Sequence, residues 1–306
     1  MFKPSAAVLP DFEETRNYNR ICFSRPEINR LSESSTVVDM HFHSKYSDGQ
    51  DDIAAIADRA RSLGIGVAIT DHNAVEGAVR MAEHKDVFSI PGIEVTSREG
   101  AHLLVYFHTT EDLVRFFEKE LTPYLGKEVM SSSWLSMEAI VASARQYRSL
   151  IVFPHPYCAM FTGVCNPLFS RSRQDFLLSA ADGIEVINAG NIHRWNIKSA
   201  FLGLDKDAGL TGGSDGHSLF QLGRAVTCAP CGKNAESFLE NVRNAQTLVV
   251  GKEINILRKV ASSGMKIRSN LRNSQDLIGK NMRYGYAVIN SRSKRLKERI
   301  GQNLQK

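Results

Sequence analysis

Apolar runs rich in β-branched residues alternate with helical stretches from residue 36 onward. This alternation is typical of βα units around a mostly parallel sheet. The predicted strands cover residues 37–41, 66–70, 87–90, 102–107, 150–153, 183–187 and 210–213. The predicted helices cover residues 52–62, 74–83, 111–121, 137–146, 174–179, 197–208 and 235–244. Seven strands, each followed by a helix or loop, favour a distorted (β/α)7 TIM-like barrel. An open doubly wound sheet is the alternative.

The two ends of the chain lack this alternation, which divides the chain into three parts. Residues 1–35 are expected to form an N-terminal arm, residues 36–255 the barrel, and residues 256–306 a basic C-terminal tail, helical near residues 291–302. The tail has 13 Lys or Arg and two acidic residues, a net charge of +11. With +5 for the whole chain, residues 1–255 therefore carry −6.

Composition narrows the class of protein. The chain of 306 residues is 42% hydrophobic and 23% charged, which is ordinary for a globular enzyme. It has no apolar run of the roughly 18 residues that cross a bilayer and no secretory signal, so a cytoplasmic protein without membrane contact is expected. The five cysteines are scattered, so reduced thiols are expected.

Histidines and carboxylates gather at the ends of the predicted strands. His41 and His43 close the first strand, and side chains two residues apart on a strand point to the same face. In α/β barrels, the carboxyl ends of the strands carry the active site. We therefore expect one site that gathers His41, His43, Asp48, His72, Glu94, His102, His155, Asp215 and His217.

These residue types indicate divalent metal ions. Imidazole and carboxylate ligands without thiolate suit Zn²⁺, Mn²⁺ or Fe²⁺. Nine candidates are too many for one ion, since a single site takes about four to six protein ligands. A lone His-x-His pair is more often a surface or core pair. Coincidence at six strand ends is a much weaker explanation, and burying so many ionisable groups without a metal would be costly.

The same segments closely resemble the polymerase-and-histidinol-phosphatase (PHP) superfamily of metal-dependent phosphoesterases, in its stand-alone form. The similarity covers roughly residues 36–250 and lies in the following segments: residues 41–49, 70–72, 92–94 with His102, 155–156, 184–188, 213–217 and 222–225. It implies a (β/α)7 barrel with up to three metal ions. It also implies a division of ligands: His41, His43, Glu94 and Asp215 for the first ion; Glu94, His102 and His155 for the second; Asp48, His72 and His217 for the third.

The expected activity is hydrolysis of a phosphate ester by a metal-bridging hydroxide at this trinuclear site. Bound metal ions neutralise phosphoryl oxygens and lower the pKa of water. We expect Glu94, Asp215 and His217 to be catalytic. Asp71 either orients a ligand histidine or simply caps its loop. The main candidates for substrate contact are Arg98, His193 and Arg194. Weaker candidates are Lys45, Arg171, Arg173, Asn188 and Asn191. We expect loops after the fifth and sixth strands to carry Arg171, Arg173, His193 and Arg194.

Several readings of the function stay open at this point. The substrate is expected to be a phosphorylated small molecule, a nucleotide or a short oligonucleotide. An amidohydrolase also begins with His-x-His, but it commonly bridges its metals with a carboxylated lysine, and no Lys stands at a comparable strand end. A non-catalytic nucleic-acid-binding PHP module is the third reading. The basic tail, with Lys294, Arg295, Lys297 and Arg299, either contacts nucleic acid or is a solvated terminus.

Overall fold

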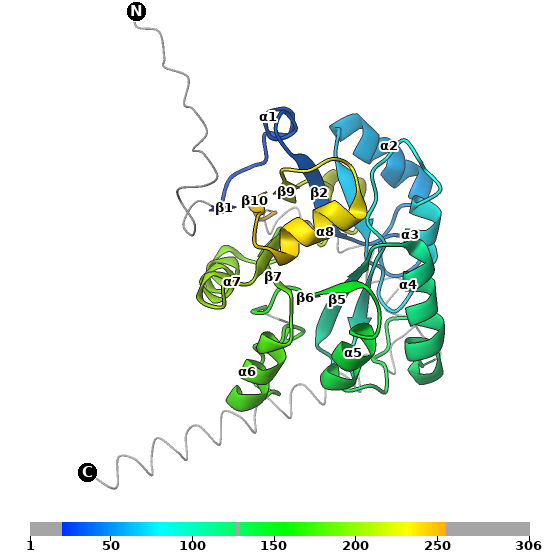
Figure 1. The fold of residues 1–306 in the computed structure, drawn as a ribbon, viewed down its shortest axis with the longest axis vertical. Coiled ribbons are helices and arrows are strands. Elements are labelled where there is room, and N and C mark those ends of the chain that lie inside the picture. The colour runs from blue at the N-terminus through cyan, green and yellow to red at the C-terminus, as the bar shows by residue number, and fades with distance from the viewer. Residues whose placement is uncertain (1–19, 127–128, 159, 255–306) are drawn as a thin grey trace, which may run out of the picture.

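The computed structural model describes residues 20–126, 129–158 and 160–254 (Figure 1). The predicted tail and residues 1–19 of the predicted arm lie outside them. The described residues form an α/β fold, as expected, with ten strands in two sheets. One sheet has the order β1 (Ile21–Cys22), β10 (Leu248–Gly251), β9 (Ala225–Ala229), β2 (Thr36–Phe42) and β3 (Gly66–Ile69). The other has the order β4 (Gly92–Thr96), β5 (His102–Phe107), β6 (Ser149–Phe153), β7 (Gly183–Asn188) and β8 (Gly209–Gly213).

The described strands form two sheets and no closed barrel, which differs from the single barrel predicted. The two sheets meet through isolated bridges at strand ends. Phe42 bridges Gly216 beyond β8, and His72 beyond β3 bridges Glu94 in β4. The carboxyl ends of β2 and β3 are therefore held beside the second sheet.

The expectation of a mostly parallel sheet is wrong for half of the strand pairs. β9 runs antiparallel to β2 and β10, and β5 runs antiparallel to β4 and β6. Only residues 97–101 join β4 to β5, which is too short for the crossover that parallel neighbours need. The result is a hairpin in which Thr96 pairs with His102.

The predicted strand at residues 87–90 is reduced to a single bridge between Ser89 and Val67. Backbone hydrogen bonds from Val67 to Phe88 and from Ile90 to Val67 begin a ladder there. Pro91 follows, and its lack of an N–H group prevents the ladder from continuing. Strand β4 starts one residue later and pairs with β5 instead. Strands β1, β9 and β10 were not predicted.

Each predicted helix overlaps a helix of the structure: α2 (Ile53–Leu63), α3 (Glu76–Met81), α4 (Thr110–Phe116), α5 (Met137–Ala144), α6 (Arg171–Ser179), α7 (His193–Asp205) and α8 (Ala235–Arg243). A short α1 (Ile28–Leu31), the π-helical turn η1 (Phe117–Leu121) and the 3-10 turns η2 (Thr122–Tyr124) and η3 (Leu219–Gln221) complete the set. Asp52 caps α2 at its first turn, and Gly64 ends it in the left-handed conformation.

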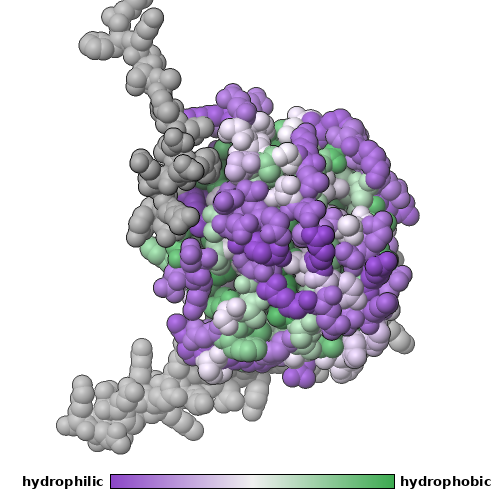
Figure 2. All heavy atoms as spheres, in the orientation of Figure 1, coloured by the Kyte–Doolittle hydropathy of each residue, from purple (hydrophilic) through white to green (hydrophobic). Residues whose placement is uncertain are grey.

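The strands carry the core. Every residue of β2 to β9 is buried, so these strands are covered on both faces. The face drawn in Figure 2 is mostly hydrophilic, with smaller hydrophobic areas low in the view. Among the described helices, none has the length and apolar character to cross a membrane. All five cysteines are free.

Candidate metal centre

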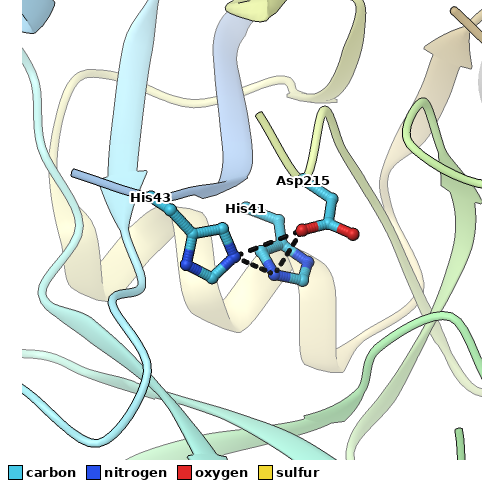
Figure 3. A group of neighbouring side chains, drawn as sticks. All are labelled: His41, His43 and Asp215. Atoms are coloured by element: carbon cyan, nitrogen blue, oxygen red, sulfur yellow. Dashed lines mark hydrogen bonds and ion pairs between the residues drawn. The ribbon is translucent and has the colours of Figure 1, made fainter. Parts of the chain in front are cut away.

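His41, at the end of β2, and His43, just beyond it, face Asp215 (Figure 3). The two Nε2 atoms are 3.2 Å apart, and Asp215 Oδ1 lies 3.2 Å from His43 Nε2 and 3.6 Å from His41 Nε2. Asp215 has a positive φ of 48°, and its backbone N–H donates to the carbonyl of His41 at 2.8 Å. This turn after β8 brings the carboxylate onto the two imidazoles.

Glu94 lies at the centre of the site and is 1% exposed. Its Oε2 is 3.3 Å from His41 Nε2, 3.4 Å from His43 Nε2 and 3.1 Å from His72 Nδ1. Its Oε1 is 2.9 Å from His102 Nδ1 and 3.4 Å from His155 Nε2. The carboxylate of Glu94 therefore contacts five imidazoles, three through Oε2 and two through Oε1.

His102 contacts Glu94 although it is the first residue of β5, whereas most other candidate ligands lie at or beyond the carboxyl ends of strands. In the antiparallel hairpin, the start of β5 lies beside the end of β4. A histidine at the amino end of β5 is therefore at the same edge as Glu94, which is in the middle of β4. Had β4 and β5 been parallel, His102 would lie at the opposite edge.

The remaining candidates form a third contact region. His217 Nε2 lies 2.9 Å from Asp48 Oδ2, and His43 Nδ1 lies 3.8 Å from Asp48 Oδ1. His72 instead groups with His43 and Glu94. The structure thus brings all nine candidates together, in four overlapping groups of three whose ligand atoms lie within 4.8 Å of one another.

Burial and charge act in opposite directions at this site. Burial disfavours ionisation of Glu94, but the positive charge that the surrounding imidazoles can carry outweighs it and holds the pKa of Glu94 well below its usual value. Against the effect of burial, nearby carboxylates raise the pKa of His41 well above its usual value, whereas burial lowers the pKa of His72 to about 3. A neutral imidazole and an ionised carboxylate are the forms in which these side chains bind metal.

The donor atoms fit divalent cations. Glu94 Oε2 and His72 Nδ1 are buried and form no hydrogen bond within the described part of the chain, although they are 3.1 Å apart. Donors 2.0–2.1 Å from a tetrahedral Zn²⁺ are about 3.4 Å from each other. The separations of 3.1–3.4 Å around Oε2 match that spacing. Buried nitrogen and oxygen donors that converge at this spacing are the arrangement of a metal site.

Comparison with known proteins identifies this region. Residues 39–182 match the sequence model of the PHP domain family. Residues 39–182 of this chain are similar to PHP domains. The resemblance predicted from the sequence is therefore confirmed.

Curated relatives share only part of this chain. An error-prone DNA polymerase of Mycobacterium tuberculosis is 33% identical over 123 residues, which are 34% of this chain and 11% of the polymerase. An uncharacterized protein of Methanocaldococcus jannaschii is 26% identical over 166 residues, 49% of this chain and 81% of that protein. The chain thus spans only a small part of the first of these relatives.

Solved structures share the fold. The lesion-specific endonuclease from Pyrococcus furiosus has a TM-score of 0.57 at 20% identity, covering 70% of this chain and 57% of the endonuclease. A two-domain protein of Bacteroides vulgatus, containing a predicted PHP-like metal-dependent phosphoesterase, has a TM-score of 0.52 at 19% identity. It covers 77% of this chain and 69% of that one. Residues 39–182 thus lie within an α/β fold that these proteins share.

Glu185 contacts His41 and His155 on the side away from the other candidate ligands' donor atoms. Sequence analysis did not name it as a functional residue. It is buried in β7, and its Oε1 lies 3.0 Å from His41 Nδ1. Its Oε2 accepts from the backbone N–H of His155 at 2.8 Å and from Asn188 Nδ2 at 2.9 Å. A carboxylate in an otherwise apolar strand was the available signal, because such a charge needs partners.

Asp39 is a second buried carboxylate that sequence reasoning missed. It accepts backbone N–H groups of Ser214 at 2.8 Å and Gly223 at 2.9 Å. Burial raises its pKa to about 6, against the opposing effect of these hydrogen bonds. Asp39 therefore fixes the segment that carries Asp215 and His217 onto β2.

Of the two roles predicted for Asp71, its contacts match the capping of a loop. Its carboxylate accepts from the backbone N–H of Ser44 at 2.7 Å and from the hydroxyls of Ser44 and Ser47, each at 2.6 Å. These bonds go to the turn between His43 and Asp48. Asp71 therefore positions that turn, and its hydrogen bonds in the described part of the chain do not orient an imidazole directly.

The predicted substrate contacts lie outside the nine-residue group. Arg98 is 62% exposed and lies 3.5 Å from Glu99. His193, 61% exposed, lies 3.1 Å from Glu253. Arg194 is exposed, and it and His193 form the first turn of α7, not a loop as predicted, because α7 starts four residues earlier than expected.

Among the weaker candidates, Arg171 and Arg173 are also helical, because Ser170 caps α6 at this point. Arg173 forms ion pairs with Glu138 and Glu99, so its charge is already balanced by two carboxylates. Lys45 is exposed near Asp52, while Asn188 donates to Asp215 Oδ2 at 3.3 Å.

Proposed function

We propose that the protein is a metal-dependent phosphoesterase that hydrolyses a phosphate ester of a nucleotide or short oligonucleotide. The observation that carries this proposal is Glu94, a buried carboxylate in contact with five imidazoles. Without cations, such a cluster would leave buried donors unsatisfied at high cost. The match of residues 39–182 to the PHP domain family, and the fold shared with a protein that contains a predicted PHP-like phosphoesterase, support the same chemistry.

The chain's own residues bind and orient the cations. Up to three divalent ions, Mn²⁺, Zn²⁺ or Fe²⁺, are proposed, divided as the family resemblance implies. When bound, such ions neutralise phosphoryl oxygens and lower the pKa of water. Glu94 is suited to bridge two of them, since its two oxygens face different imidazoles. Glu185 holds His41 in the tautomer that offers Nε2 to the site.

Three finer points belong to the same proposal. Asp215 and His217, on the turn after β8, would act together with Glu94 at the reacting phosphate. The two sheets would correspond to the two parts of a distorted (β/α)7 barrel that is open between them. The protein is proposed to act in the cytoplasm.

A nucleotide or nucleic acid is the preferred substrate class within this proposal. The curated relative with 33% identity is a DNA polymerase, and a neighbour of the same fold is a lesion-specific endonuclease. The positive charge of residues 256–306 would add affinity for phosphates. An amide or lactam is a poorer substrate, because enzymes of that class commonly bridge their metals with a carboxylated lysine and no Lys stands at a comparable strand end of this sequence.

Elemental analysis and an activity screen test the proposal. The purified protein should contain Mn, Zn or Fe and should hydrolyse phosphomonoesters, diesters or nucleotides under added Mn²⁺, but not amides or lactams. The variant Asp215→Ala should remain folded and lose turnover. Asp205→Ala, at the exposed end of α7, is the matched control and should retain it. Unchanged turnover in Asp215→Ala would eliminate this mechanism.

A further inference from the structure

Two aromatic rings stand beside the metal centre together with two cations. Tyr157 and Trp195 have nearly parallel rings, at 8°, with centroids 6.5 Å apart. Lys198 Nζ lies 4.8 Å from the Trp195 centroid and 5.7 Å from the Tyr157 centroid. Arg194 lies over Trp195 at 4.9 Å. We call these four residues the aromatic platform.

The platform is joined to the metal centre on both sides. Tyr157 follows His155 by two residues, so their Cα atoms are at most about 7 Å apart. Trp195 precedes Asn196, whose Nδ2 donates to the carbonyl of Asn188 at 2.9 Å. Asn188 in turn donates to Asp215. Both rings therefore extend from backbone that is anchored at proposed metal ligands.

The platform has the chemistry that binds a nucleobase next to a phosphate. Both rings are partly exposed, and Arg194 and Lys198 are exposed. Neither cation forms an ion pair with a carboxylate among the described residues, in contrast to Arg173. Aromatic faces stack on bases of any sequence, and adjacent cations follow the backbone of a single strand. A small phosphorylated sugar has no aromatic face to stack on these rings and would contact the cations alone.

We propose that the aromatic platform stacks the nucleobase of the nucleotide whose phosphate is bound at the metal centre, and that Lys198 and Arg194 contact its backbone. This inference rests on the proposed function, since it assumes that the scissile phosphate lies among the nine ligands. It assigns the substrate's base, rather than its phosphate, to residues of β6–α6 and α7.

Fluorescence can test the platform because the chain has two tryptophans. In Trp134→Phe, which removes an exposed residue, Trp195 is the only tryptophan. This protein is titrated in Mn²⁺ with a 5′-phosphorylated, phosphorothioate-linked pentadeoxyadenylate. A second titration uses the same backbone with abasic sites. Stacking on Trp195 should quench its emission with the first probe only, and the affinity should be at least about fivefold higher for it.

Variants of Tyr157 and Lys198 distinguish contacts to the bases of the probe from contacts to its backbone. Tyr157→Leu should lose most of the difference between the two probes, whereas Tyr157→Phe should keep it. Lys198→Gln should weaken both probes equally, while Lys119→Gln, an exposed lysine of η1, should weaken neither. Equal quenching and equal affinity for the two probes would overturn the platform, and this comparison needs no platform variant to fold.

Activity is measured separately, as Mn²⁺-dependent phosphate release from a 5′-phosphorylated abasic oligomer with ordinary linkages. If release occurs and base-dependent quenching does not, the platform is wrong and the phosphoesterase stands. If quenching is base-dependent and no phosphate ester is hydrolysed, the proposed function fails while the binding site is supported.

Discussion

Glu185 is a buried carboxylate placed to orient His41, a proposed metal ligand. One oxygen faces His41 Nδ1 and the other accepts the backbone N–H of His155. If Nδ1 of His41 donates its proton to Glu185, Nε2 would offer its lone pair to a cation that Glu94 and Asp215 also contact. Such partners of ligand histidines typically change metal affinity 10–100-fold when they are replaced.

Glu185→Gln should therefore weaken metal binding by about 10–100-fold without unfolding the protein. Glutamine preserves the shape but has only one acceptor oxygen, so the contacts to His41 and to the His155 backbone compete for it. Competition with a chelator of known affinity measures the effect, and circular dichroism checks the fold. Glu118→Gln, on the surface of η1, is the control. Equal metal affinity in both variants would show that Glu185 does not orient His41.

The spacing of residues explains why the nine candidates could be named from sequence while their supports could not. His41 and His43 stand two apart on a strand, and others follow strands directly, so position alone placed them at one edge. Glu185 and Asp39 lie inside strands, where alternation cannot show what a buried carboxylate contacts. Asp71 was identified as a supporting residue, but its partners, Ser44 and Ser47, depend on how the turn folds.

At the scale of elements, strand direction was the least predictable feature. Apolar runs identify β5 and β6 but carry no information about their direction. Only the short connection between β4 and β5 signals a hairpin, and the strand at residues 92–96 was itself placed too early. Strand β1 has only two residues, and it is a strand because it pairs with β10, which is distant in the sequence. Long-range contacts of this kind cannot be deduced from local pattern.

Gly213 tests how closely β8 approaches β2. A Cβ added at Gly213 would lie 2.3 Å from the Cβ and 2.6 Å from the backbone N of His41. Gly213→Ala should therefore push the strands apart, lower the free energy of unfolding by roughly 1–3 kcal/mol and weaken metal binding. Gly232→Ala is the matched control, because nothing lies within 4 Å of its added Cβ. Urea unfolding compares the two, and coincident curves would contradict this close approach.

An ion pair between helices α5 and α6 gives a pH-dependent prediction. Hydrogen bonds from Arg173, the largest cause, lower the pKa of Glu138 to about 2 from 4.5. A carboxylate whose pKa is lower in the folded state stabilises the fold above the unfolded pKa, and the contribution is lost as pH falls from 4.5 toward 2. The pair is partly exposed, so the effect is small.

Glu138→Gln should thus be less stable than the wild type at pH 6, and the difference should shrink steadily between pH 4.5 and pH 3. Urea unfolding at several pH values measures this. Glu118→Gln, which lies away from Arg173, provides the comparison. A difference that grows on acidification would have the wrong sign for this ion pair.

Across the whole molecule, the candidate metal centre lies where the two sheets meet. His41, His43 and His72 come from the sheet of β2 and β3, whereas Glu94 and Asp215 come from the sheet of β4 and β8. Among the described residues, the backbones of the two sheets pair through two isolated bridges, Phe42 with Gly216 and His72 with Glu94. Cations held by both sets of ligands would therefore join the two sheets.

Metal binding should consequently stabilise the entire fold. A ligand that binds only the folded state contributes about 2.7 kcal/mol at a concentration of 100 Kd. For a domain of this size, 1 kcal/mol shifts Tm by roughly 2–4 °C, so one ion should raise Tm by about 5–10 °C. Calorimetry in Mn²⁺ and in EDTA measures this shift. In Asp215→Ala, whose carboxylate comes from the second sheet, the shift should be smaller, because the group with His41 and His43 is incomplete. A wild-type Tm that is identical in Mn²⁺ and EDTA would mean that no cation joins the sheets.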